Sequence, residues 1–240
     1  MKLDRITAWL DRTLDIASFD DVSNNGLQID RTAGDIVRVA FAVDASVRAV
    51  EAAADAEAQL LVVHHGISWG GGIRRLTGGA YRVAKAAIDA NVAVYASHLP
   101  LDAHPKLGNN ARLADILRLR RTTPAFTYHG NVIGLVGTAT AETAAALGRL
   151  GAENPVPAGM RVGVCSGGAG EFAEEAKRLG CGLLVTGEAS WGDVISAENC
   201  MMPVACCGHY ATEVYGVRAL SVAMKRALKV ETVDLTEALA

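Results

Sequence analysis

Two segments decide the fold of this chain, RVAFAV at residues 38–43 and LLVVHH at residues 60–65. The apolar run in each segment is short and bounded by polar residues, which is typical of buried strands. Residues 47–58 between them are predicted to form a helix. Strands separated by a helix of this length predict a largely parallel or mixed sheet that is covered by helices.

A second copy of this unit is predicted further along the chain. It starts at RVGV, residues 161–164, and ends at Gly187 and Glu188. From the arginine to the first residue of the closing pair, both units advance by 26 positions. A further strand in each half then leads to His98 or His209, and an acidic residue follows four positions later. Internal duplication explains these spacings best, and chance similarity between α/β units is the alternative.

Strands and helices alternate over the whole chain. We predict helices near 2–16, 47–58, 80–90, 140–150, 170–179, 191–199 and 211–228, and strands near 37–43, 60–63, 92–96, 131–137, 161–165, 183–186 and 203–207. The expected fold is α/β, with two similar halves at residues 1–125 and 126–240 and mixed sheets covered by helices. Residues 121–128 are interpreted as the junction.

Composition excludes several classes of protein. Hydrophobic residues make up 50% of the 240 residues and charged residues 20%, which is usual for a soluble globular protein. A net charge of −3 with scattered basic residues gives no footprint for nucleic acid. We expect no membrane span, because no window holds about 18 apolar residues. Five cysteines without a CxxC motif predict reduced thiols in the cytoplasm, with a vicinal Cys206–Cys207 disulfide as the alternative.

His64 and His65 are the first candidate metal ligands. In open α/β sheets, ligands gather beyond the carboxyl ends of the strands, and these histidines directly follow four apolar strand residues. Two adjacent histidines more often make hydrogen bonds within a loop. At the end of a buried strand, however, neutral imidazoles can present a nitrogen to a metal ion. Because adjacent side chains point in different directions, the pair can serve two ions.

Asp102, His209 and Glu213 are the other candidate ligands. His209 and Glu213 stand four positions apart at the predicted start of a helix, so both side chains reach the same centre. The alternative is a surface pair worth about 0.2–0.5 kcal/mol. Residues 201–207 are apolar, however, and an unpaired carboxylate beside a buried strand would cost several kcal/mol. Asp102 follows a loop stiffened by Pro100, where helix capping is the other interpretation.

Three imidazoles and two carboxylates exceed the usual four ligands of one zinc ion. They suit two divalent ions about 3.5–4 Å apart. The sequence therefore predicts two divalent metal ions per chain, in a cleft between the two halves. Imidazole and carboxylate ligands accommodate Zn, Fe, Mn, Co or Ni.

These residues resemble a known family, the dinuclear metal-centre hexamers that are labelled GTP cyclohydrolase I type 2-like. The similarity runs through NNGLQ (24–28), VDAS (43–46), VHHG (63–66), SHLPLD (97–102), TGE (186–188) and GHYATE (208–213). It implies two duplicated α/β domains, a toroidal homohexamer, and metal ligation by the same five residues. Two departures stand out: Val22-Ser23 replaces the family's Trp-Asp, and residues 189–192, ASWG, follow Glu188 where many members have a histidine.

A metal-dependent hydrolase is the leading functional hypothesis. His98 or Glu188 is the expected proton carrier, although a hydrogen-bonded loop histidine and a helix-capping carboxylate are equally valid interpretations. The resemblance implies a purine nucleotide whose imidazole ring is opened, and other small molecules remain candidates. Residues 70–75, GGGIRR, are interpreted as a mobile loop or a phosphate cradle. The competing hypothesis is a non-catalytic metal-binding hexamer that acts as a scaffold or regulator.

Overall fold

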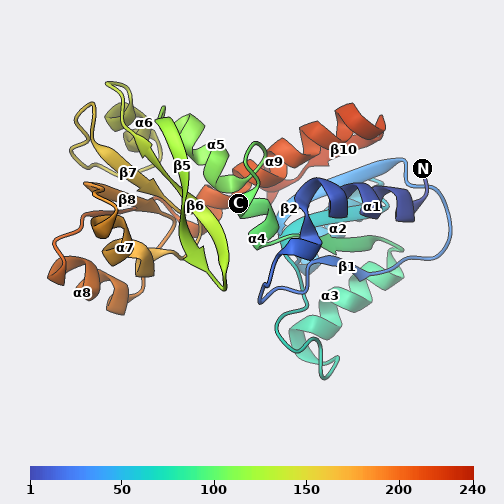
Figure 1. The fold of residues 1–240 in the computed structure, drawn as a ribbon. Coiled ribbons are helices and arrows are strands. Elements are labelled where there is room, and N and C mark those ends of the chain that lie inside the picture. Colours follow the sequence, from blue (N-terminus) through green and yellow to red (C-terminus); the bar gives the residue numbers. More distant parts are fainter. The chain divides into compact units, whose positions relative to one another are not determined.

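The computed structural model describes all 240 residues as two compact units (Figure 1). The first unit comprises Met1–Leu101 and Val217–Ala240, and the second comprises Asp102–Gly216. Each unit is built on one five-stranded mixed sheet. None of the helices combines the length and the apolar composition that a membrane span requires.

The sheet of the first unit has the strand order β1-β4-β3-β2-β10. The last four of these strands run parallel to one another, whereas β1 is antiparallel to β4. The strands are β1 (Gly26–Ile29), β2 (Arg38–Asp44), β3 (Leu60–His65), β4 (Ala93–Ala96) and β10 (Glu231–Asp234). The helices are α1 (Leu3–Leu14), η1 (Ile16–Ser18), α2 (Val47–Asp55), α3 (Gly78–Asp89) and α10 (Thr236–Leu239).

Helices cover both faces of this first sheet, which explains the continuous apolar runs of its strands. On one face, Leu61 and Val63 of β3 pack in a core with α2 and α3. These helices contribute mainly alanines, so they can approach the strands closely. On the other face, the hydroxyl of the buried Tyr95 donates a hydrogen bond to Asp11 of α1 at 2.8 Å.

The sheet of the second unit has the order β5-β6-β7-β8-β9. Strands β5, β6 and β7 are antiparallel neighbours, and β7, β8 and β9 are parallel. The strands are β5 (Arg120–Tyr128), β6 (Asn131–Thr138), β7 (Arg161–Val164), β8 (Leu183–Thr186) and β9 (Val204–Cys206). The helices are α5 (Asn109–Ile116), α6 (Thr143–Arg149), η2 (Gly170–Phe172), α7 (Ala173–Arg178) and α8 (Trp191–Asn199). The chain enters this unit along α4 (Leu99–Ala103) and leaves it along α9 (His209–Leu228).

The predicted α/β fold with two similar halves is confirmed. Strands β2, β3 and β4 are adjacent and parallel, and so are β7, β8 and β9 at the equivalent places of the second unit. The sheets differ at their edges, because β1 and β10 flank the first set of three whereas β5 and β6 extend the second set on one side.

The units are not divided after residue 125, where the sequence patterns place the boundary. Strand β10 pairs in parallel with β2, so the C-terminal segment belongs to the first unit. Residues 121–128, expected to be a junction, lie within β5, which pairs with β6 and so belongs to the second unit. Both differences arise from sheet pairing between segments that local periodicity does not connect.

Candidate metal centre

His64 and His65 end β3 and are held there by the two neighbouring strands. The imidazole Nδ1 of His64 is hydrogen-bonded to the carbonyl oxygen of Ser97 at 3.0 Å. That of His65 lies 2.8 Å from Oδ1 of Asp44, the residue opposite it in the β2–β3 register. Because Nδ1–H donates a hydrogen bond to an acceptor, the lone pair of each neutral ring lies on Nε2. This arrangement is the one that metal-binding histidines use, since the acceptor fixes the tautomer and the ring orientation.

His98 joins these two rings after the end of β4. Its Nδ1 lies 2.9 Å from Oδ1 of Asp21, and its backbone N–H donates to Oδ1 of Asn25 at 2.8 Å. Ring nitrogens of His64, His65 and His98 all lie within 4.8 Å of one another. The first unit therefore holds a cluster of three imidazoles that could bind a metal ion. His98, considered from the sequence as a proton carrier, lies within this cluster.

Asp21 is a site residue that the sequence patterns did not reveal. Its carboxylate is 1% exposed and also accepts hydrogen bonds from Asn25 Nδ2 and from the backbone N–H of Ser23 and Leu99. Burial opposes ionisation and by itself would raise the pKa of Asp21. The hydrogen bond and the charge interaction with His98, together with the hydrogen bond from Asn25, outweigh burial and lower this pKa to about 2. Asp21 is therefore an anion that orients His98.

Asp44 was also missed as the residue that holds His65. One signal could have found it, because Asp44 ends a buried strand next to the one that ends in His64 and His65. No comparable signal points to Asp21, which lies in an irregular segment between η1 and β1.

The second unit contributes a carboxylate-rich group. Oδ1 of Asp102 accepts hydrogen bonds from Nδ2 of Asn109 at 2.8 Å and from Oγ of Ser166 at 3.1 Å. His209 begins α9, and its Nε2 lies 3.3 Å from Oε1 of Glu213, one helical turn further on. Asp102 and Glu213 are both buried, and carboxylate oxygens of the two lie within 4.8 Å of each other. The predicted ligands of this unit thus converge at one place.

Glu188 follows β8 and holds His209 from its other side. Its Oε1 lies 2.9 Å from Nδ1 of His209, so the Nε2 of this ring is the nitrogen that faces Glu213. The hydrogen bond to Glu213 raises the pKa of His209 against the effect of burial, and with the contribution of Glu188 the pKa reaches about 9. Without a metal ion, a proton on His209 balances the neighbouring carboxylates, and a bound cation would replace that proton.

Gly167 makes room for the carboxylate of Glu213. A Cβ atom at this position would lie 2.3 Å from Oε1 of Glu213 and 3.4 Å from Nε2 of His209. The backbone φ of Gly167 is +68°, a conformation that L side chains rarely adopt. The loop after β7 therefore approaches the acidic group as closely as it does because it carries no side chain there.

The donor atoms of both units fit divalent transition-metal ions. Imidazole nitrogen and carboxylate oxygen are ligands that Zn, Fe, Mn, Co and Ni share. All four histidines have Nδ1 bound by an acceptor: a carbonyl oxygen for His64 and carboxylates for His65, His98 and His209. The loop at residues 70–75 follows Trp69, whose ring lies 5.2 Å from that of His98, and its Arg74 and Arg75 are exposed.

Comparison with known proteins identifies the family. A model of the Duf34/NIF3 (NGG1p interacting factor 3) family matches residues 1–238. A Pyrococcus horikoshii protein named GTP cyclohydrolase 1 type 2 homolog is 39% identical over 97% of this chain and 97% of its own length. A Deinococcus radiodurans protein of the same name is 40% identical over 91% of this chain and 86% of its own.

A solved structure shares the fold of this chain over nearly its whole length. The crystal structure of TTHA1606 from Thermus thermophilus is similar with a TM-score of 0.81 and 32% identity, and the match covers 98% of both chains. The resemblance inferred from the short motifs is thereby confirmed over nearly the whole length. This chain belongs to the Duf34/NIF3 family.

Proposed function

We propose that this protein is a metal-dependent hydrolase with a dinuclear metal centre. The proposed ligands are His64, His65, Asp102, His209 and Glu213. The observation that carries the proposal is the set of acceptors on the histidines at the strand ends: each ring is fixed through Nδ1 so that Nε2 can coordinate. The proposal that the ligands of the first unit and those of the second unit share one pair of ions rests on the internal repeat and on the family.

Bound at these residues, two divalent ions would supply Lewis acidity and activate water near neutral pH. The chain's own residues would position the ligands and move protons. Asn109 and Ser166 both donate to Oδ1 of Asp102 and so fix the orientation of this carboxylate, whose remaining lone pairs would bind the metal. His98 is the proposed proton carrier at Nε2, and the buried Asp21 anion holds its ring through Nδ1. Glu188, which contacts His209, is proposed as a positioning residue or a second proton carrier.

The names of the curated relatives make GTP the first substrate to test. Metal-loaded protein should be assayed against GTP, phosphoesters and cyclic amides, with His98→Gln beside the matched control His129→Gln. His129 lies in the β5–β6 turn and is exposed. The hydrolase proposal expects turnover of one of these substrates and a drop of roughly 10²–10⁴-fold in kcat for His98→Gln alone.

A non-catalytic metal-binding role is the second candidate, and one observation favours it. Ring nitrogens of His98, His64 and His65 all lie within 4.8 Å of one another. A third imidazole on one ion would close a position that catalysis needs open, as in structural metal sites. Absence of turnover with all substrates, together with loss of metal from His98→Gln, would decide for a scaffold or regulator.

We further propose a toroidal homohexamer in the cytoplasm as the working assembly. Family resemblance supports the hexamer, and the unpaired cysteines agree with a reducing compartment. Light scattering coupled to sizing chromatography tests the assembly, since a monomeric mass would contradict it. Fractionation of the cells that produce the protein tests the compartment.

A further inference from the structure

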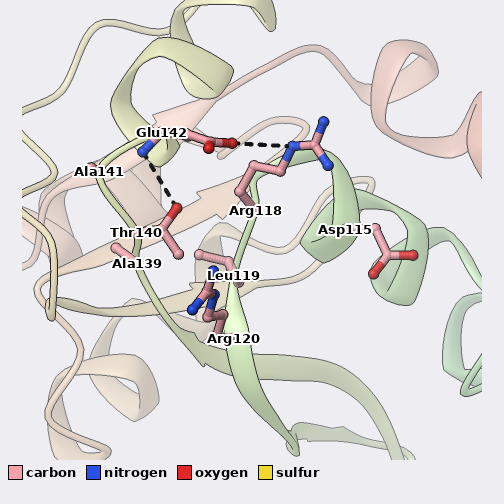
Figure 2. A pocket seen from close by; sticks show the side chains of 8 residues that line it. All are labelled: Asp115, Arg118, Leu119, Arg120, Ala139, Thr140, Ala141 and Glu142. Carbon is pink, nitrogen blue, oxygen red and sulfur yellow. Dashed lines mark hydrogen bonds and ion pairs between the residues drawn. The ribbon is translucent and has the colours of Figure 1, made fainter.

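The second unit has a polar cavity that shares no lining residue with the candidate metal centre (Figure 2). It lies between the C-terminal end of α5, the start of β5 and the loop at residues 139–142 that leads to α6. Its volume is about 780 Å³, within the range of pockets that hold small-molecule ligands. Nothing in the proposed hydrolase function uses this cavity.

Two arginines and two carboxylates line the cavity, and both carboxylates already have an arginine partner. Nε of Arg118 faces Oε2 of Glu142 at 3.6 Å, and these side chains are 62% and 74% exposed, so a ligand can displace the pair easily (Figure 2). The other carboxylate, Asp115, accepts a hydrogen bond from Arg112 at 2.9 Å, outside the lining. Arg120 forms no ion pair with the protein. Two guanidinium groups are therefore available to an anion.

The backbone that carries these arginines adopts a conformation that disfavours side chains. Arg118 follows the end of α5 with a φ of +59°, and the N–H of Leu119 donates to the carbonyl of Ala114 at 3.0 Å. This way of ending a helix normally uses glycine. Arg121 also has a positive φ, +52°, and the β5–β6 register shifts just after Arg120. Such distortions redirect side chains and are concentrated near functional sites.

We propose that this cavity is a second ligand site, which binds a small phosphate monoester. A forked guanidinium group fits phosphoryl oxygens in general, and both Arg118 and Arg120 line the cavity. Leu119 and the adjoining alanines would contact the carbon skeleton. On binding, the phosphate takes the place of Glu142 beside Arg118.

Isothermal titration calorimetry of metal-free protein in the presence of a chelator tests the proposal without interference from the metal centre. The probes are ribose 5-phosphate, inorganic phosphate, ribose and acetate. We expect ribose 5-phosphate and phosphate to bind, and ribose and acetate to bind at least tenfold more weakly. Arg120→Gln should weaken ribose 5-phosphate about tenfold or more, since charged hydrogen bonds are lost. The control Arg149→Gln, an exposed arginine of α6 outside the cavity lining, should bind like wild type.

Arg118→Gly separates ligand binding from folding. Glycine relaxes the left-handed backbone, so the midpoint of thermal unfolding should rise, while ribose 5-phosphate binding falls at least tenfold. A variant that is more stable and binds more weakly cannot owe its weaker binding to misfolding. The proposal is overturned if wild-type protein does not bind ribose 5-phosphate at millimolar concentration, if Arg120→Gln binds it unchanged, or if acetate binds equally well.

Discussion

His98 and Asp21 are joined through Nδ1 and Oδ1 at 2.9 Å, although 77 positions separate them in the chain. The same carboxylate also accepts the backbone N–H of Leu99, so it holds the residue after His98 as well. Asp21 therefore determines both the ring orientation of His98 and the start of α4. A buried anion with this role makes the stability of the protein depend on pH.

The Asp21 carboxylate should stabilise the metal-free fold above about pH 4. Its pKa falls from 3.8 to about 2 on folding, so its contribution is present above the unfolded pKa and is lost as the pH drops toward 2. We expect a loss of about 1–2 kcal/mol in the free energy of unfolding over this window. Urea denaturation at several pH values measures it. Asp21→Asn should be less stable than wild type at pH 7, and its free energy of unfolding should fall less between pH 4 and 2. If the free energies of unfolding of the two proteins change in parallel with pH, the assignment is contradicted.

Asp44→Ala should weaken metal binding without unfolding the protein. The Asp44 side chain is 54% exposed, so its removal leaves no buried charge, but His65 loses the acceptor at 2.8 Å that orients its ring. Loss of such a partner typically lowers metal affinity about 10–100-fold. Competition with a chromophoric chelator gives the affinity. Asp89→Ala, an exposed carboxylate of the same unit that pairs with Lys85, is the control and should retain wild-type affinity.

Gly167→Ala should disrupt the acidic group of the second unit. The new methyl group would lie 2.3 Å from Oε1 of Glu213, so the carboxylate has to move. Gly180→Ala is the matched control, because Gly180 has a φ of +75° and open space around its Cβ position. Both variants carry a backbone cost of about 1–2 kcal/mol. Only Gly167→Ala should also lose metal, as elemental analysis can show; equal metal contents would refute the contact.

Glu213→Ala should lower the number of ions bound per chain. Elemental analysis of freshly purified wild-type protein should give about two divalent ions. Glu213 is buried beside Asp102 and His209, so its removal takes a carboxylate from the centre of the proposed ligand set. Glu198→Ala, an exposed carboxylate of α8, serves as the control. An unchanged metal content in Glu213→Ala would exclude this residue as a ligand.

Local sequence patterns were sufficient for most elements but not for the sheet edges. Strand β3 was predictable because its apolar residues are buried on both faces. Strand β5 was not, because the first five of its nine residues are exposed and show no alternation. Strand β10 is short and half-buried, and its place beside β2 depends on pairing over most of the chain length. Periodicity reports burial, so it cannot detect strands that are scarcely buried.

The sequence by itself determined which residue types stand at the strand ends: His64 and His65 after an apolar run, and His209 and Glu213 one helical turn apart. These relations are local, and the geometry of one strand or one helix is enough to predict them. Only the tertiary structure decided which acceptor holds each ring, as Asp21 does for His98 and Asp44 for His65. Such partners come from distant segments, and the register between neighbouring strands and loops brings them within hydrogen-bonding distance.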